Sequence, residues 1–276
     1  MVKYYWIDKS GRKVGSLYQM SYLSNQQIQH FIRTGFVKVE NAFSDEIAAE
    51  CISLLWEEIN LKPDQPKTWN EPVIRINELN HSPFLEAANT TQLLKAYQQL
   101  AHNNWRPLES MGSFPIRFPS KREANDTGWH VDASFQGDNP ENFLEWKINI
   151  RSKGRALLML FLFSDVTETD APTKIIKGSH INVARLLHSS GESGLSFMEL
   201  AKKLGDIPSQ DIALATGKAG TVYLCHPFIV HAAQNHNGSF PRFMAQPPLI
   251  SKYDFNLDKS YEDACPVEKA ILIGLK

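Results

Sequence analysis

The run Gly128-Trp129-His130-Val131-Asp132 lies in the middle of a long region of short β-type segments. If the run forms a strand, His130 and Asp132 point to one face and Val131 to the other. An imidazole nitrogen and a carboxylate oxygen suit several divalent metals. Two histidines and one carboxylate on one face of the ion are typical of non-haem Fe(II) oxygenases, so the run predicts a metal site if the chain supplies a second histidine.

Turn residues separate the β-type segments after Trp105. These segments span residues 113–118, 128–132, 143–150, 156–163, 173–176, 221–225, 228–231 and 242–246. One helical stretch, at about residues 179–204, interrupts them. Many short strands between turns indicate a β-sandwich or barrel. We predict a mainly β core with flanking helices, in which the strands could close into a barrel that holds a ligand in its mouth, as a jelly roll does.

The first hundred residues are mainly helical by pattern. The predicted elements are helices at 25–33, 44–59 and 90–101, a strand at 36–39 and a long loop at 60–83. Ser24 and Ser44 suit helix N-caps, and Gly35 suits a helix end. The first ~20 residues, with two glycines, are predicted as a hairpin or arm. We expect one domain, with a helical flank at 1–105, a catalytic core at 106–250 and a C-terminal extension at 251–276.

Composition and charge exclude several functions. The 276 residues are 42% hydrophobic and 21% charged with a net charge of −1, so the chain has no electrostatic footprint for nucleic acid. The longest apolar run, at 156–163, is far shorter than the ~20 residues of a membrane-spanning helix. The N-terminal residues do not resemble a signal peptide. The widely spaced Cys51, Cys225 and Cys265 indicate reduced thiols, so we expect a cytoplasmic protein. The oligomeric state stays open.

Four histidines are candidates for the second imidazole ligand: His180, His226, His231 and His236. His226 and His231 lie on one strand-like run and are five residues apart. If that run is regular they face opposite ways, so only one of them can be the ligand. His180 follows a turn and begins a helical stretch.

Arg242 gives His231 a useful neighbour, because the turn residues 237–239 separate the two. A hairpin over this turn would bring the guanidinium back beside the metal, and arginine binds carboxylates with a planar fork. An open metal position beside an arginine fits a 2-oxo-dicarboxylic acid. Taken singly, the His-x-Asp pair could be a chance pattern, His231 a surface histidine and Arg242 a solvated strand residue. The combination favours the metal site.

With these segments in order, the chain resembles the phytanoyl-CoA dioxygenase family of Fe(II)/2-oxoglutarate-dependent oxygenases over roughly residues 24–270. The segments that carry the resemblance are Gly35-Phe36-Val37-Lys38-Val39, Ile116-Arg117-Phe118-Pro119, Gly128–Asp132, Asp170-Ala171-Pro172-Thr173, Lys177-Gly178-Ser179-His180, and His231 with Arg242. The resemblance implies a double-stranded β-helix, the cupin-like jelly roll. It also implies that Fe(II), 2-oxoglutarate and O2 are used on a small-molecule substrate.

The resemblance assigns roles to particular residues. It implies that His130, Asp132 and His231 are the iron ligands and that Arg242 binds the far carboxylate of 2-oxoglutarate. Relatives often carry a serine on that carboxylate where this chain has Ala233. Two further residues, Arg117 and Thr173, are candidates for additional co-substrate contacts, and His180 is usually structural in the family.

The reaction type follows in part from the same resemblance. Halogenating relatives replace the metal carboxylate by a small residue, so Asp132 favours hydroxylation. Desaturation, cyclisation or epimerisation with the same cofactors stays an alternative. A non-catalytic metal-binding β-barrel would not need Arg242, and a zinc hydrolase would need a general-base carboxylate that spacing does not identify. Residues 188–211 are a candidate lid.

Overall fold

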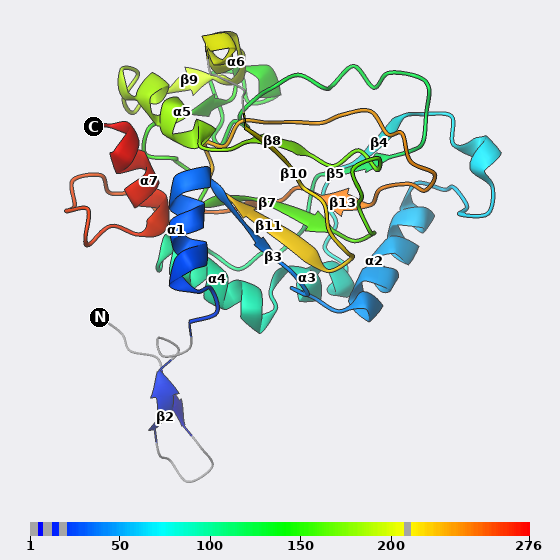
Figure 1. The fold of residues 1–276 in the computed structure, drawn as a ribbon, viewed down its shortest axis with the longest axis horizontal. Helices are drawn as coiled ribbons and strands as arrows, with labels where there is room; N and C mark the ends of the chain where they lie inside the picture. Colours follow the sequence, from blue (N-terminus) through cyan, green and yellow to red (C-terminus); the bar gives the residue numbers. More distant parts are fainter. Residues whose placement is uncertain (1–4, 8–12, 17–20, 207–210) are drawn as a thin grey trace.

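The structure is a computed structural model that describes residues 5–7, 13–16, 21–206 and 211–276. Two β-sheets lie one above the other, and helices cover the outer face of the larger sheet (Figure 1). The mainly β core with flanking helices agrees with the fold class expected from the sequence. In the described part of the chain the two sheets are not joined by strand pairing, so they form a sandwich rather than a closed barrel.

The larger sheet has the order β13-β7-β11-β3, with β14 also paired to β7 and all pairs antiparallel. Its strands are β3 (Phe36–Val39), β7 (Leu157–Leu162), β11 (Thr221–Cys225), β13 (Met244–Ala245) and β14 (Pro248–Leu249). Every residue of β7 is buried. Its even-numbered side chains enter the core between the sheets, whereas its odd-numbered side chains pack beneath the helices. A strand covered on both faces needs a continuous apolar run, which explains the sequence of β7.

The smaller sheet has the order β10-β8-β12 and faces the site. Its strands are β8 (Lys174–Ile176), β10 (Ile212–Leu214) and β12 (His231–Ala232). Ile175 of β8 packs in the core between the sheets, opposite the even-numbered side chains of β7. Because β12 begins at His231 and pairs with β8, the sheet fixes the position of this histidine.

The helical layer includes the helices predicted at 25–33, 44–59 and 90–101, together with two helices that the sequence patterns did not predict. It contains α1 (Asn25–Thr34), α2 (Asp45–Glu58), α3 (Ser82–Ala88), α4 (Thr91–Ala101), α5 (Ser179–His188) and α7 (Pro266–Gly274). Ser24 and Gln27 form a capping box on α1, and Gly35 ends this helix with a φ of 89°. Ser44 caps α2 by accepting from the backbone of Ile47. Helix α7 contacts α1, α4 and α5 and completes the layer.

Three regions differ from the sequence prediction. The expected loop at 60–83 contains η2 (Pro66–Thr68) and β4 (Val73–Ile76), and β4 pairs with β5 (Phe114–Arg117). The expected single helix at 179–204 consists of α5, β9 (Leu195–Ser196), α6 (Phe197–Lys203) and η4 (Leu204–Asp206). After α5 ends at His188, Gly191 and Gly194 adopt positive φ values of 52° and 66°, which an α-helix does not allow. The expected strand at 143–150 begins with η3 (Phe143–Glu145) before β6 (Lys147–Ile148), which pairs with β9.

The remaining expectations concern the chain ends and the environment. Strands β1 (Tyr5–Ile7) and β2 (Lys13–Ser16) pair antiparallel, and the rest of the expected N-terminal arm lies outside the described residues. No helix in the described ranges is long and apolar enough to cross a membrane. The three cysteines are buried free thiols. The division into flank, core and extension stays a prediction.

Candidate active site

The backbone brings His130 and His231 together. The run 128–132 is extended but forms one isolated β-bridge rather than the predicted strand. The backbone N–H of each histidine donates to the carbonyl of the other, and both N···O distances are 3.0 Å. Side chains of such an antiparallel pair stand on the same face. Val131 is buried in the core on the other side, as the alternation of side chains predicts.

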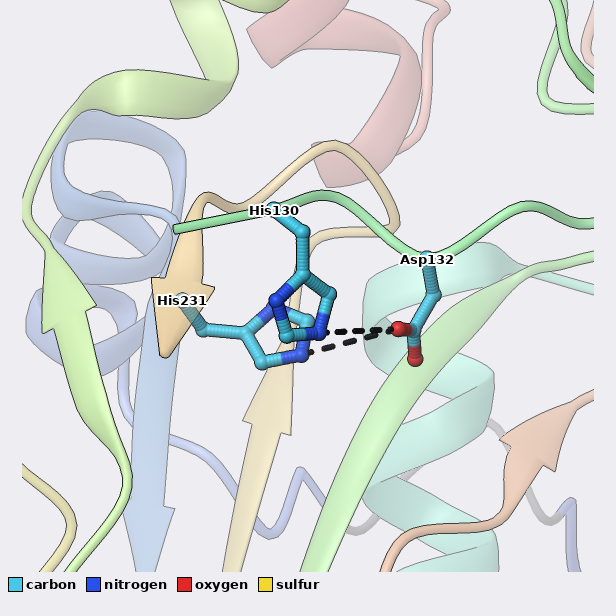
Figure 2. A group of neighbouring side chains, drawn as sticks. All are labelled: His130, Asp132 and His231. Atoms are coloured by element: carbon cyan, nitrogen blue, oxygen red, sulfur yellow. Dashed lines mark ion pairs between the residues drawn. The ribbon is translucent and has the colours of Figure 1, made fainter. Parts of the chain in front are cut away.

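Asp132 joins the two imidazoles in one cluster (Figure 2). Its Oδ1 atom lies 3.5 Å from His130 Nε2 and 3.7 Å from His231 Nε2. The centroids of the two rings are 4.4 Å apart, and one potential ligand atom from each residue lies within 4.8 Å of the others. The two nitrogens and the carboxylate oxygen therefore face a common point.

Hydrogen bonds to the backbone decide which nitrogen of each ring is free. His130 Nδ1 lies 2.9 Å from the carbonyl oxygen of Gly128, and His231 Nδ1 lies 3.3 Å from that of Ile229. A carbonyl only accepts, so each Nδ1 carries the proton and donates it. Each Nε2 then keeps its lone pair and points towards Asp132. This is the tautomer that a metal-binding imidazole needs.

The charges at the cluster suit metal ligation. Burial would raise the pKa of the Asp132 carboxyl, but the neighbouring histidines and Arg155 outweigh burial and hold that pKa well below its ordinary value. Burial, assisted by the nearby His130, lowers the pKa of His231 to about 4. Burial would also lower the pKa of His130, but the contact with Asp132 dominates and raises it. At neutral pH Asp132 is therefore ionised and His231 is neutral.

The cluster lines a cleft of about 1420 Å³. An aromatic row, defined as Trp146, Phe143 and Phe197, leads along one wall to His130. Successive ring centroids are 5.7, 5.5 and 5.7 Å apart from Trp146 to His130. Phe143 is 47% exposed although it is apolar, so this wall offers an open apolar surface beside the cluster.

Two buried arginines lie at another part of the cleft. Arg117 and Arg242 pair through their backbones, with N···O distances of 3.1 and 2.8 Å. Arg117 Nη2 donates to both carboxylate oxygens of Asp126, each at 2.6 Å. Arg242 donates to two carbonyl oxygens, those of Ala171 and Pro115. No carboxylate of a described residue lies within ion-pair distance of Arg242, and the Nε atoms of both arginines lack a described partner.

The unbalanced charge of Arg242 has an electrostatic consequence. Burial, with the nearby Arg117, lowers the pKa of Arg242 to about 9. A buried cation is costly unless an anion pairs with it. The site therefore fits a ligand carboxylate at Arg242.

Thr173 and Ala233 line the same cleft. The Thr173 hydroxyl is buried, and its described contact is the sulfur of Met244 at 3.7 Å. A buried hydroxyl is thus present in the cleft, whereas Ala233, where the resemblance leads us to expect a serine, supplies none. The structure brings together the six residues singled out by the sequence, namely His130, Asp132, His231, Arg242, Arg117 and Thr173. Their roles in binding stay predictions.

The other histidine candidates lie away from the cluster. The rings of His180 and His226 pack against each other in the helical layer, with centroids 4.9 Å apart. His236 accepts the backbone N–H of Gly238 through Nδ1 at 3.1 Å and is buried. None of these three lines the cleft.

Three site residues were not identified from the sequence: Asp126, Arg155 and Gln246. Arg155 donates to the carbonyl oxygens of Asp132 and Ala133 and places Nη1 3.6 Å from Asp132 Oδ2. Gln246 could have been found, because residues two and four positions after a strand residue share its face. Once Arg242 is placed in the site, that rule also places Gln246 there. No comparable signal marks Asp126, which lies in a loop.

The donor set fits a non-haem Fe(II) centre, since two imidazole nitrogens and one carboxylate oxygen converge beside an open cleft. The unpaired Arg242 in the same cleft fits an acidic co-substrate. A mainly β sandwich with this site defines the class of cupin-like metal oxygenases.

Comparison with known proteins gives the family. The model of the family described as phytanoyl-CoA dioxygenase (PhyH) matches residues 31–244. The chain belongs to the phytanoyl-CoA dioxygenase family of Fe(II)/2-oxoglutarate-dependent oxygenases. No curated protein sequence matches the chain.

Solved structures share the jelly-roll fold, which confirms the predicted fold class. SnoK, a non-heme α-ketoglutarate-dependent carbocyclase from nogalamycin biosynthesis, has a TM-score of 0.59 at 17% identity, over 84% of this chain and 85% of SnoK. EctD from S. alaskensis, solved with 2-oxoglutarate and 5-hydroxyectoine, has a TM-score of 0.54 at 21% identity, over 84% and 77%. HygX from Streptomyces hygroscopicus, solved with nickel and 2-oxoglutarate, has a TM-score of 0.52 at 15% identity, over 81% and 86%.

Proposed function

We propose that the protein is an Fe(II)/2-oxoglutarate-dependent dioxygenase that hydroxylates a small molecule in the cleft. One observation carries the proposal. The cluster of His130, Asp132 and His231 opens into the same cleft as a buried arginine that no described carboxylate balances. A metal site and an anion site in one cleft are what a chelating 2-oxo acid with a second carboxylate requires.

His130, Asp132 and His231 would hold the iron through two Nε2 atoms and a carboxylate oxygen. Bound iron with 2-oxoglutarate supplies the activation of O2: one oxygen atom goes to succinate, which forms with CO2, and the other goes to the substrate. The carbonyl partners of the two Nδ1 atoms keep both rings oriented towards Asp132. The protein therefore contributes a preformed set of ligands on one side and an open cleft on the other.

Arg242 would pair with the far carboxylate of 2-oxoglutarate. Its Nη atoms are already fixed by two carbonyl oxygens, so the guanidinium is held in place before the co-substrate arrives. The Thr173 hydroxyl would donate a hydrogen bond to the same carboxylate. It would replace the serine hydroxyl that is missing because position 233 is an alanine. The Arg117 guanidinium already donates to Asp126. Arg117 would therefore influence the bound co-substrate mainly through its positive charge and through its backbone pairing with Arg242.

The aromatic row would receive the apolar part of the substrate. Trp146, Phe143 and Phe197 form a continuous wall that ends at His130, so a substrate carbon lying on this wall reaches the metal side of the cleft. Contact with these rings would exclude water from the reacting carbon. A small-molecule substrate, rather than nucleic acid or a membrane, also fits the even charge balance of the chain.

Cyclisation, desaturation or epimerisation with the same cofactors is the second candidate reaction. The likeness to SnoK, a carbocyclase, supports keeping it, because the outcome depends on where the substrate radical forms. A non-catalytic metal-binding role is disfavoured by Arg242, whose burial would serve no purpose in such a protein. The expected cytoplasmic location is part of this proposal and rests on the reduced cysteines.

An anaerobic titration of Fe(II)-loaded protein with 2-oxoglutarate tests the proposal. We expect a weak visible charge-transfer band as the 2-oxo acid chelates the metal. His231→Ala and Asp132→Ala should lose the band because they lose a ligand. Arg242→Leu should need far more 2-oxoglutarate, by roughly 10- to 100-fold, because one charged hydrogen-bonding partner is lost.

His188→Ala is the matched control, since His188 is an exposed histidine at the end of α5. It should give the wild-type band. Wild-type protein that binds iron but gives no band would overturn the proposal. If the band forms, release of succinate with candidate substrates and the mass of the product then separate hydroxylation, which adds one oxygen atom, from the second candidate reaction.

A further inference from the structure

Gln246 reaches the metal cluster from the edge of the larger sheet. Strands β13 and β14 pair with β7 in one unbroken register, and Gln246 lies between them. Its backbone N–H donates to the carbonyl oxygen of Ser113 at 2.8 Å, which anchors the segment on its other side. Arg242, Met244 and Gln246 are each two residues apart, and all three line the cleft. The strand thus presents Gln246 to the cluster from a rigid position.

The carboxamide of Gln246 contacts two of the three candidate ligands. Its Nε2 atom lies 3.1 Å from Asp132 Oδ2 and 3.1 Å from His231 Nε2. The chemistry of the partners fixes the orientation of the amide. Gln246 Nε2 donates to Asp132 Oδ2, and His231 Nε2 keeps its lone pair because Nδ1 faces the carbonyl oxygen of Ile229, so both partner atoms accept hydrogen bonds. The NH2 group, with two N–H donors, must therefore face them.

The two oxygens of Asp132 have different surroundings. Oδ1 faces both histidine Nε2 atoms, at 3.5 and 3.7 Å. Oδ2 meets Gln246 Nε2 at 3.1 Å and Arg155 Nη1 at 3.6 Å. A carboxylate can bind a metal through one oxygen or through both. Hydrogen bonding at Oδ2 opposes the second mode, because it holds that oxygen against donors of the protein.

The number of metal bonds made by Asp132 matters for the proposed reaction. A centre with two histidines and one carboxylate needs open positions for the 2-oxo acid and for O2. A second bond from Asp132 would occupy one of these positions. We infer that Gln246 is a positioning residue, which holds Asp132 as a one-oxygen ligand and so keeps a metal position open for 2-oxoglutarate. The inference rests on the proposed function.

Gln246→Leu removes the donors while nearly preserving the size of the side chain. Two dissociation constants are measured without oxygen: that of Fe(II) alone, from quenching of tryptophan fluorescence, and that of 2-oxoglutarate, from the charge-transfer band. We expect the variant to keep its Fe(II) affinity, because Asp132 can still bind the metal. We expect its 2-oxoglutarate affinity to fall by roughly tenfold or more, as for loss of a hydrogen bond to a charged group.

Gln98→Leu is the matched control, because it makes the same chemical change in α4, where Gln98 contacts Trp105. It should leave both constants unchanged. Equal losses of Fe(II) and 2-oxoglutarate affinity in Gln246→Leu would mean that Gln246 merely supports the fold of the site, and unchanged constants would mean that it does not act on Asp132. Either result overturns the inference while leaving the proposed function standing. Absence of the band in wild-type protein would overturn both.

Discussion

The molecule contains two pairs of neighbouring imidazoles whose ring planes are tilted against each other, and their hydrogen bonds differ. In the pair at the cleft, His130 and His231, the Nδ1 atoms donate to carbonyls two residues earlier in the chain. Neither Nε2 atom bonds to the backbone, and both face Asp132, with His231 Nε2 also 3.1 Å from Gln246 Nε2. The hydrogen bonds from Nδ1 to nearby carbonyls thus fix the tautomer of each ring, and the Nε2 atoms point towards the cleft.

The pair in the helical layer uses its nitrogens in the opposite way. His180 Nε2 donates to the carbonyl oxygen of Ile32 at 3.0 Å, and His226 Nε2 donates to that of Val267 at 3.2 Å. His226 Nδ1 accepts the backbone N–H of Phe228 at 3.1 Å. These bonds connect α5 and the β11–β12 turn to α1 and α7. The comparison teaches that the nitrogens occupied by the backbone decide whether an imidazole pair is suited to hold a metal, as proposed for the cleft, or joins helices, as in the helical layer.

One alanine substitution in each histidine pair gives the largest expected effect on stability and on metal binding. His226→Ala should lower the free energy of unfolding by about 2–5 kcal/mol, because it leaves a cavity and two backbone groups without partners. The folded fraction should still bind Fe(II). His231→Ala should show the reverse pattern, with metal binding lost and a much smaller change in stability. Urea unfolding and Fe(II) titration of each variant measure both quantities, and equal loss of metal binding in the two variants would contradict the division of roles.

Added metal should stabilise the protein through one pair alone. Fe(II) at 100 times its dissociation constant should raise the free energy of unfolding by about 2.7 kcal/mol, because it binds the folded state. Thermal unfolding without oxygen, with and without a chelator, measures the shift. The shift should vanish in His130→Ala and persist in His180→Gln. A shift that persists in His130→Ala would place the metal elsewhere.

The pH dependence of stability should give a smaller effect per pH unit, to which the helical-layer pair contributes alongside His231, whose pKa is also lowered to about 4. Burial lowers the pKa of His180 to about 4 and that of His226 well below 6.5. Between pH 6.5 and about 4 the unfolded chain therefore binds more protons at these positions, so stability is full above pH 6.5 and falls as the pH drops. Each buried histidine contributes about 1.4 kcal/mol per pH unit in this window. Urea unfolding across the window should give a shallower slope for His180→Gln, and a slope equal to that of the wild type would refute this role.

Sequence patterns predicted what depends on local geometry. The alternation of side chains placed His130 and Asp132 on one face, and caps such as Ser24 located the helices. The choice of His231 over His226 rested on its spacing to Arg242 and on the resemblance, since Pro227 breaks the run that carries both histidines and strand geometry does not hold there. The β-bridge that joins His130 to His231 spans a hundred residues, and no local pattern encodes it.

The missed elements have different causes. Strand β4 is short and follows a proline-rich loop. The turn residues around it therefore predicted a loop, although β4 contains β-branched residues. Helix α7 begins at Pro266, a favourable first helical position, but the segment was left without an assignment. The ion pair between Arg117 and Asp126 depends on how a loop folds over β5, which residue spacing does not determine.

The burial of β7 on both faces also bears on how the chain is made. The strands that pair with β7 are β11 and the β13–β14 segment, and both follow it in the sequence. During synthesis both edges of β7 therefore stay unpaired until the later strands, which end at residue 249, have been made. Its six residues, Leu-Leu-Met-Leu-Phe-Leu, carry no charge and no proline, the composition of segments that aggregate when exposed. Nascent or partly unfolded chains should thus tend to aggregate through β7 until β11 and the β13–β14 segment pair with it.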